Sequence, residues 1–198
     1  MDEQKANDRL GEAFGEAFRF AHRLHADQRR KGPDGVPYVA HLVGTSSLVL
    51  EAGGDEEQAI AALLHDAAED QGGEDVLEEI RERFGERVAR IVDGCSDTLE
   101  HPKPPWRERK EAYLASLPGK PVDVLLVSCA DKLYNARAIL RDHRRVGDAL
   151  WERFDASAEA TAWYYRGLLD GFRASQLESW LVDELEQTVA AIEGRVNP

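Results

Sequence analysis

One segment, VDVLLVSCADKLYNARAIL at residues 122–140, limits the choice of fold more than any other part of this sequence. Its first half is apolar on nearly every side, which is typical of an element at the centre of a hydrophobic core. Val124 and Val127 would also suit a strand, but the sequence offers no second strand candidate to pair with it. We therefore predict a buried central helix at this position and an all-α fold.

The other apolar residues recur at helical spacing between breaks made by glycine and proline. The spacing predicts helices over residues 10–24, 38–52, 55–70, 74–84, 86–92, 106–117, 155–172 and 176–192. Asp55 is expected to cap the third of these helices, and the Gly72-Gly73 pair to stop it. Residues 97–105, DTLEHPKPP, are expected to form a loop, because prolines and the residues before them disfavour the helical conformation.

The composition fits one soluble globular domain of 198 residues, with 42% hydrophobic and 32% charged residues. No repeat or long linker interrupts the chain, so we expect a single domain over residues 1–198, with the motifs at 12–140 and C-terminal helices at 150–193 that pack on it. The 38 acidic and 25 basic residues give a formal net charge of -13, which disfavours nucleic acid as a partner. An anionic small molecule would need a local cluster of basic side chains.

Several features are typical of a cytoplasmic protein. The acidic, polar N-terminal stretch does not resemble a signal peptide, and no apolar run approaches the ~20 residues needed to cross a bilayer. Cys95 and Cys129 stand apart without CxxC spacing, so we expect two buried, reduced thiols. We expect neither a membrane nor a nucleic acid as a partner, and the sequence leaves a homo-oligomer open.

The stretch LLHDAAED at residues 63–70 places three carboxylates and one imidazole within one and a half turns of helix. Like charges at this spacing repel one another, and more strongly when they are buried. A bound cation would remove that repulsion. In a continuous helix Glu69 lies one turn beyond His65, and Asp70 one turn beyond Asp66, so the acidic pair could reach past the cation toward a substrate.

Two further residues could complete such a site, His41 in PYVAH and Asp131 in the middle of the buried helix. A carboxylate inside an apolar helix is costly unless it is paired or bound to a cation. Each residue alone has a plainer interpretation: a single His is more often a core or surface residue, and Asp131 could pair with Lys132 or Arg137. Imidazoles and carboxylates together form a mixed nitrogen and oxygen site that suits manganese, iron or zinc. The candidate ligands are His41, His65, Asp66 and Asp131.

The order H…HD…D resembles the HD phosphohydrolase superfamily. The finer motifs resemble its alarmone hydrolase branch, which comprises the hydrolase half of RelA/SpoT-type proteins and the stand-alone small alarmone (ppGpp) hydrolases. The matching stretches are RKGPDGVPYVAH, ALLHDAAED, FGERVARIVDGCSD and ADKLYNAR. This resemblance implies a compact HD-domain helical bundle. It also implies manganese-dependent hydrolysis of the 3′-pyrophosphate of guanosine tetra- or pentaphosphate, which gives GDP or GTP plus pyrophosphate.

The same resemblance implies a role for individual residues. The implied ligands of one divalent ion are His41, His65, Asp66 and Asp131, and the implied catalytic pair is Glu69 and Asp70. The implied nucleotide pocket consists of Arg30, Lys31, Tyr38, Asn135 and Arg137, with Arg30 packed on the guanine ring. A bound divalent ion would lower the pKa of its water, and the acidic pair would orient that water or carry its proton. Manganese is the ion that the resemblance implies, although the ligand set also accepts zinc or iron.

The sequence departs from the family pattern at Leu42, where relatives usually have proline, and at residues 95–105, which lack the usual valine-threonine pattern. These departures leave the hydrolase class intact and open the substrate: the guanosine alarmone leads, and the alternatives are an adenosine alarmone, another 3′-phosphorylated nucleotide such as NADPH, and a nucleoside monophosphate. A catalytically silent HD module that binds nucleotides and regulates a partner is an alternative from another class. The basic run WRERK at 106–110 would face either distal phosphates or solvent. We expect Arg141, Arg144 and Arg145 on the surface, and Trp163, Tyr164 and Tyr165 in core packing.

Overall fold

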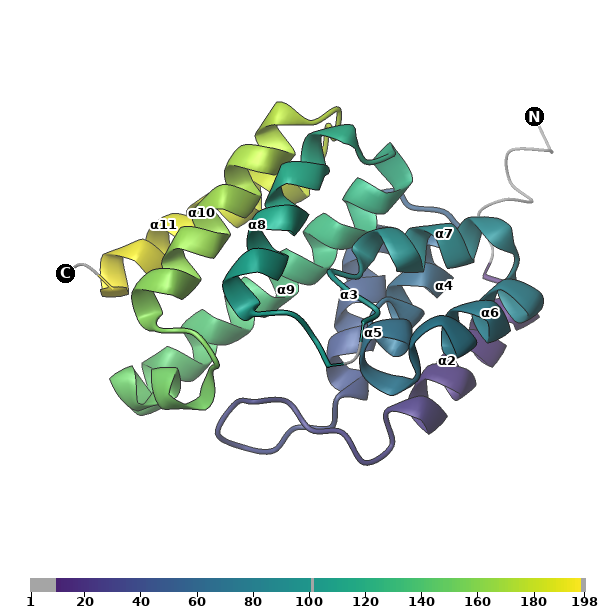
Figure 1. Ribbon diagram of the computed structural model, residues 1–198. Coiled ribbons are helices and arrows are strands. Elements are labelled where there is room, and N and C mark those ends of the chain that lie inside the picture. The colour runs from purple at the N-terminus through teal and green to yellow at the C-terminus, as the bar shows by residue number, and fades with distance from the viewer. Residues whose placement is uncertain (1–9, 101, 197–198) are drawn as a thin grey trace.

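The computed structural model describes residues 10–100 and 102–196, and these residues form helices joined by short loops (Figure 1). The helices are α2 (Glu12–Leu24), α3 (Val39–Glu51), α4 (Glu56–Leu64), α5 (Ala67–Gln71), α6 (Gly73–Phe84), α7 (Glu86–Cys95), α8 (Trp106–Ser116), α9 (Val122–Val146), α10 (Ala158–Ala174) and α11 (Trp180–Val196), with 3-10 turns η1 (Leu117–Gly119) and η2 (Gly147–Arg153). Within these described ranges the one β pairing is an isolated bridge between Arg29 and Pro37. The predicted all-α fold is confirmed.

Helix α9 is the central element, as predicted from its apolar first half. Leu125, Val127 and Cys129 are fully buried in it. It packs against α3, α4 and α7 on one side and against α10 and α11 on the other, so it separates the N-terminal helices from the C-terminal ones (Figure 1). Gly44 lets α3 come close to α9, because a Cβ atom there would overlap the ring of Tyr134. This close approach matters because both helices carry candidate site residues.

The predicted helix over residues 55–70 is wrong in its middle. Asp55 does cap α4, since its side chain accepts from the backbone N–H of Gln58 and the Gln58 side chain accepts from the N–H of Asp55. However, α4 ends at Leu64, and α5 begins only at Ala67. Asp66 has φ −97° and ψ −3°, at the edge of the helical region. The residues between the two helices are the HD pair, so this pair lies on a turn.

In α2 the aromatic side chain that faces the core is Phe20, whereas Phe18 is 40% exposed on another side of the helix.

The start of one helix also differs from the prediction. Helix α10 starts at Ala158 instead of at Asp155, since Ser157 caps it by accepting from the N–H of Ala160. Asp155 is thereby left outside the helix, where its side chain has another partner.

The C-terminal helix α11 packs along α9 and against α10. The expectation of one domain over residues 1–198 also involves residues beyond the described ranges and stays a prediction, as does the interpretation of the first nine residues. Cys95 and Cys129 are buried free thiols, as predicted, and burial raises the pKa of Cys95 to about 12. None of the helices in the described residues is long and apolar enough to cross a membrane.

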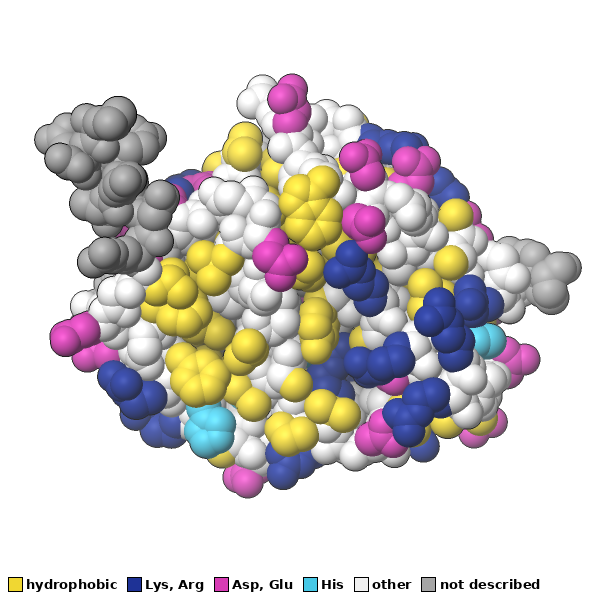
Figure 2. Space-filling view, turned by 180° about the vertical axis from the view of Figure 1, so that it is seen from behind, with side chains coloured by type: hydrophobic (Ala, Val, Ile, Leu, Met, Phe, Trp, Pro, Cys, Tyr) yellow, Lys and Arg dark blue, Asp and Glu magenta, His cyan; other side chains and the backbone are white. Residues whose placement is uncertain are grey.

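The outer surface mixes apolar and charged side chains. Seen from behind, apolar side chains run across the middle of the face, and many Lys and Arg side chains gather on one side (Figure 2). The large apolar residues that are exposed are Leu10, Phe18, Val43, Val122 and Trp180. Nothing in this distribution sets an oligomeric state.

Candidate metal centre and adjoining cavity

Three parts of the chain bring the candidate ligands together: α3 carries His41, the turn between α4 and α5 carries His65 and Asp66, and α9 carries Asp131. The two Nε2 atoms of His41 and His65 are 3.1 Å apart. Asp66 Oδ2 lies 3.3 Å from His41 Nε2 and 3.1 Å from His65 Nε2. Asp131 Oδ1 lies 3.2 Å and 3.4 Å from the same two atoms. The four side chains therefore aim at one point.

These separations suit a divalent ion. With ligand bonds of about 2.1 Å, neighbouring ligand atoms lie about 3.0 Å apart in octahedral and about 3.4 Å apart in tetrahedral coordination. His41, His65 and Asp66 alone form a cluster that could hold a metal ion. His65 Nδ1 lies 2.8 Å from the carbonyl oxygen of Ala62 and donates to it, which directs Nε2 toward the other candidate ligands. Two imidazoles and two carboxylates make a donor set that manganese, iron and zinc all accept.

The charges at the centre compensate one another in part. Burial disfavours the charged form of His65, but the neighbouring carboxylates of Asp66 and Asp131 outweigh this effect and raise the pKa of the imidazole. Burial also disfavours the charged form of Asp131, which by itself would raise the pKa of this carboxyl. The positive charges of Lys132 and His65 outweigh burial and lower that pKa below its usual value. The carboxylates are thus held in the ionised form that binds a cation.

Hydrogen bonds from neighbouring residues orient the carboxylate ligands. Lys132 Nζ donates to Asp131 Oδ2, and Asn135 Nδ2 donates to Asp131 Oδ1, both at 2.6 Å. The hydroxyl of Tyr38 donates to Asp66 Oδ2 at 2.7 Å. Burial and the nearby carboxylates raise the pKa of Tyr38, so this hydroxyl stays protonated. Such outer partners fix the direction of ligand lone pairs.

The acidic pair Glu69 and Asp70 lies on α5, directly after the candidate ligands His65 and Asp66. Lys103 from the proline-rich loop lies between them, with its Nζ 2.9 Å from Glu69 Oε1 and 3.3 Å from Asp70 Oδ1. Gln28 donates to Asp70 Oδ2 at 2.9 Å, and the backbone N–H of Asp97 donates to Glu69 Oε2 at 3.2 Å. Burial and the carboxylate of Asp97 raise the pKa of Glu69. One member of the pair therefore takes up a proton more readily than an exposed carboxylate.

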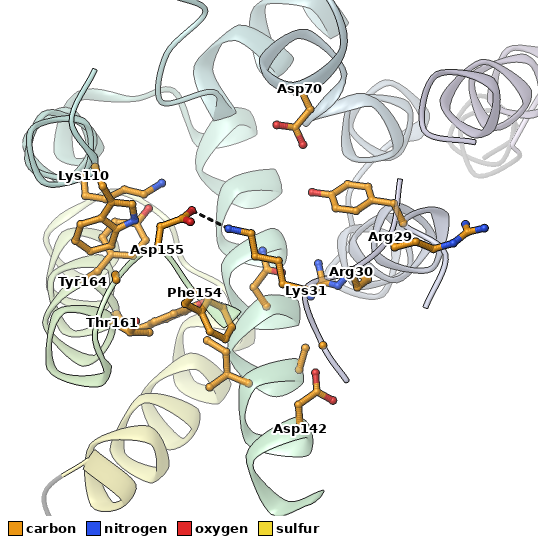
Figure 3. A pocket seen from close by; sticks show the side chains of 18 of the residues that line it. Arg29, Arg30, Lys31, Asp70, Lys110, Asp142, Phe154, Asp155, Thr161 and Tyr164 are labelled. Carbon is orange, nitrogen blue, oxygen red and sulfur yellow. Dashed lines mark hydrogen bonds and ion pairs between the residues drawn. The ribbon is translucent and has the colours of Figure 1, made fainter. Parts of the chain in front are cut away.

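A cavity of about 450 Å³ opens beside these residues, between the N-terminal loop, α9 and the segment that leads into α10 (Figure 3). Its lining includes the predicted site residues Arg30, Lys31, Tyr38, Asp70 and Asn135. The Arg30 guanidinium carbon lies 5.7 Å from the centre of the Tyr134 ring and 6.0 Å from that of Tyr38. Lys31 Nζ reaches Asp155 Oδ2 at 2.8 Å across the cavity. The cavity thus joins a cationic, aromatic wall to the candidate metal centre.

Arg137 is the one predicted pocket residue that the structure does not bring to this site. Its side chain donates to Glu184 Oε2 of α11 at 2.9 Å, on the outside of the molecule. The physical reason is the helical phase of α9, because residue 137 points about 200° away from residue 135. The alternative pairing of Asp131 with Arg137 is therefore wrong, whereas its pairing with Lys132 is present.

The basic run at 106–110 divides between the cavity and the surface. Lys110 lines the cavity and, with Arg109, binds the carboxylate of Asp97. Arg107 lies over the ring of Trp163, 3.3 Å from its centre. Arg141 and Arg145 form exposed ion pairs with Asp142 and Asp34, and Arg144 is exposed, as predicted. Tyr164 and Tyr165 are buried, as predicted, and also line the cavity.

Two site residues escaped prediction, Gln28 and Lys103, whereas Lys132 was considered only as a possible partner of Asp131. Lys103 lies in a loop without periodicity, and its partners Glu69 and Asp70 precede it by more than 30 residues. No spacing rule joins positions so far apart. A lone lysine between prolines, in a loop of an otherwise helical chain, was the only local signal.

The comparisons with known proteins agree with this geometry. The HD domain family matches residues 17–158. A human protein named guanosine-3′,5′-bis(diphosphate) 3′-pyrophosphohydrolase MESH1 is 38% identical over 128 residues, which cover 64% of this chain and 69% of that protein. A protein of Synechocystis named as a probable enzyme of the same kind is 39% identical over 132 residues, or 62% of this chain and 16% of that protein.

Solved structures give the same picture. A structure described as a metazoan orthologue of SpoT that hydrolyses ppGpp has a TM-score of 0.72 and 25% identity, and covers 96% of this chain and 98% of that chain. A structure from Listeria monocytogenes has a TM-score of 0.67 and 27% identity, and covers 77% of this chain and 97% of that chain.

Proposed function

Because this chain belongs to the HD domain family, we propose that it is a metal-dependent 3′-pyrophosphohydrolase of guanosine 3′,5′-bis(diphosphate) and its pentaphosphate. The observation that carries the proposal is the convergence of two histidines and two aspartates beside a cavity of about 450 Å³. The cavity wall carries Arg30 and Lys31, together with Tyr38 and Asn135, which donate to the two aspartates. The two curated relatives described above, which bear names of this activity, support the choice of substrate. The reaction converts guanosine tetraphosphate and water into GDP and pyrophosphate.

We assign the metal ligands as His41, His65, Asp66 and Asp131, and manganese as the ion. When bound, such an ion lowers the pKa of a water ligand and stabilises negative charge on phosphoryl oxygens. The side chains hold their own positions in advance, because the hydroxyl of Tyr38 and the Lys132 ammonium bind the carboxylate oxygens. A preorganised ligand set loses little conformational entropy when the ion enters.

The acidic pair is placed to act on the attacking water. Asp70 lines the cavity, and Glu69 shares Lys103 with it. We assign to this pair the orientation of the water that attacks the phosphorus bound to O3′ and the removal of its proton. The P–O3′ bond breaks, and O3′ leaves with a proton. General acid and base catalysis of this kind is worth about 10² to 10⁴ in rate.

The cavity walls bind the rest of the nucleotide. Arg30 offers a flat cation that stacks on a heterocyclic base, and its position beside Tyr134 keeps that plane in place. Lys31 and Lys110 of the cavity wall, and Lys103 beside Asp70, supply positive charge for the phosphates in a protein whose net charge is -13. Asn135 lies between the base wall and the metal centre.

The test is a chromatographic product assay with purified, chelator-treated protein. Manganese, zinc or iron is added back, and guanosine tetraphosphate, its adenosine counterpart, NADPH and nucleoside monophosphates are offered in parallel. We expect manganese-dependent release of GDP and pyrophosphate from guanosine tetraphosphate, and none from the Asp66→Ala protein. Turnover of a different nucleotide alone would overturn the substrate assignment. If the protein binds manganese but hydrolyses none of these nucleotides, the result would favour a non-catalytic HD module that binds nucleotides and regulates a partner.

A further inference from the structure

One stripe of α9 leads from the metal centre along the cavity. Asp131, Asn135, Ala138 and Asp142 are spaced by four, three and four residues, so they lie on the same side of the helix. Asn135, Ala138 and Asp142 all line the cavity. Eleven residues of helix span about 16 Å. Asp142 therefore marks the end of the cavity that is farthest from the candidate metal centre.

The far end has the character of a slot for a flat ring. Ala138 and Ile139 of α9 form one apolar wall, and Phe154 contributes another. Arg30, whose guanidinium is planar, borders the same space (Figure 3). Apolar walls with a few convergent polar groups are typical of pockets that bind small molecules. A heterocyclic base fits this description better than a phosphate does.

Asp142 is the polar group at the bottom of this slot. It is only 5% exposed, and its carboxylate is turned from α9 toward the loop that carries Gly32 (Figure 3). One oxygen, Oδ1, accepts from Arg141 Nε at 2.9 Å. The other, Oδ2, has no donor among the described residues and is not sealed from solvent. An open carboxylate oxygen on a cavity wall can accept from an N–H of a ligand.

We propose that Asp142 is a specificity-determining residue that selects guanine by accepting from its N1–H and 2-amino groups. This inference rests on the proposed function, because it names the base that the same cavity takes. Adenine in the same position would turn its unprotonated N1 toward the carboxylate, and two acceptors repel each other. Hypoxanthine keeps the N1–H but lacks the amino group, so it loses one of the two hydrogen bonds. A site with a buried acceptor rejects ligands that leave it unpaired.

The test compares three bases on three proteins. The substrates are the 3′,5′-bis(diphosphates) of guanosine, inosine and adenosine, and the proteins are wild type, Asp142→Asn and Asp148→Asn. Asp148 is an exposed aspartate that pairs with His143 outside the cavity, so it controls for the chemical change. In parallel, calorimetry measures binding of GDP, IDP and ADP to the chelator-treated proteins, which gives a readout that needs no turnover.

We expect wild type to prefer guanosine over adenosine, with inosine between them. Asp142→Asn should lower kcat/KM for the guanosine compound by about ten- to a hundredfold, the value of a hydrogen bond to a charged group. It should leave kcat/KM for the adenosine compound unchanged or raise it, because the amide removes the repulsion between two acceptors, and Asp148→Asn should change nothing. Equal losses on all three bases would indicate a structural role for Asp142 and would overturn the inference.

The inference and the proposed function can fail separately. If wild type hydrolyses guanosine and adenosine compounds equally well, the hydrolase stands and the role of Asp142 is overturned. If no bis(diphosphate) is hydrolysed, the proposed function fails, and the binding of GDP against ADP still decides the role of Asp142. Equal binding of both, or none of either, overturns it. The comparison of inosine with guanosine uses wild type alone, so it does not depend on the folding of any variant.

Discussion

The two ends of the cavity satisfy their polar groups in different ways. At the metal end, Asp131 accepts from Lys132 and Asn135, and Asp66 accepts from Tyr38. At the far end, Asp142 has a single hydrogen-bond partner, Arg141, and the adjoining cavity wall includes the apolar side chains of Ala138, Ile139 and Phe154. The metal end is therefore organised by the protein itself, whereas the far end is completed by a ligand. This difference separates the part that performs the chemistry from the part that chooses the substrate.

The two ends also come from different parts of the chain. The metal end uses α3, the α4–α5 turn and the start of α9, while the far wall uses the end of α9 and the segment around Phe154. Sequence identity with the human relative covers 64% of this chain, but the structural likeness to the metazoan SpoT orthologue covers 96%. The structural likeness thus extends over more of the chain than the sequence alignment does.

The largest expected effect is a loss of catalysis without a loss of metal binding, caused by a substitution beside the candidate metal centre. We expect Asp70→Asn to lower kcat by about 10² to 10⁴, because the pair that handles the proton of the water is broken. Manganese affinity should stay within about threefold of wild type, since the ligand atoms are untouched. Steady-state kinetics and calorimetry with manganese measure the two quantities. A parallel loss of manganese affinity would show that Asp70 belongs to the ligand set.

A second expected effect concerns the stability of the metal end without its ion. Lys132 is mostly buried and pairs with Asp131 at 2.6 Å, with its side chain 15% exposed. Lys132→Met should lower the free energy of unfolding of the metal-free protein by about 3 kcal/mol, because it leaves a buried carboxylate without its cation. Manganese should recover part of this loss, since a bound ion supplies positive charge to Asp131.

Urea unfolding with chelator and with manganese measures this effect. Arg144→Met is a matched control, because Arg144 is exposed on the same helix. Equal stability of Lys132→Met and wild type in chelator would mean that Asn135 and the histidines satisfy Asp131 without Lys132. The metal end would then be less dependent on built-in charge than we infer.

The sequence predicted the metal end better than the far end, for physical reasons. His41, His65, Asp66 and Asp131 each have a plainer interpretation alone, but their occurrence together in one order, in mostly apolar segments, indicated a site. The break at His65 could not be predicted, because it depends on a ring nitrogen bonding to the carbonyl of Ala62. A helical pattern continues through such a turn without any change in residue type.

The far end left no comparable signal in the sequence. Asp142 lies in a charged run with Arg141, Arg144 and Arg145, where a carboxylate is an ordinary surface residue. Its burial comes from the close approach of Gly32, which is more than 100 residues away. Arg137 shows the opposite error: its place in a motif suggested the pocket, but the phase of α9 turns it to Glu184.

The smallest expected effect lies between the two ends, where Lys31 crosses the cavity to Asp155 (Figure 3). The side chains are 56% and 76% exposed, so the pair contributes at most about 1 kcal/mol. Asp155→Asn frees Lys31 for a phosphate and removes a negative charge from the wall. We therefore expect KM for guanosine tetraphosphate to fall by about two- to fivefold, with kcat and stability unchanged.

Steady-state kinetics at low and high salt checks this prediction, with Asp148→Asn as the control for an exposed carboxylate. The difference in KM should shrink as salt is added, because exposed charges are screened. A rise in KM would mean that Asp155 contacts the nucleotide directly, for instance through a ribose hydroxyl. In that case the wall around Phe154 would already be organised for its ligand, and the contrast between a prepared metal end and an open far end would be weaker than we infer.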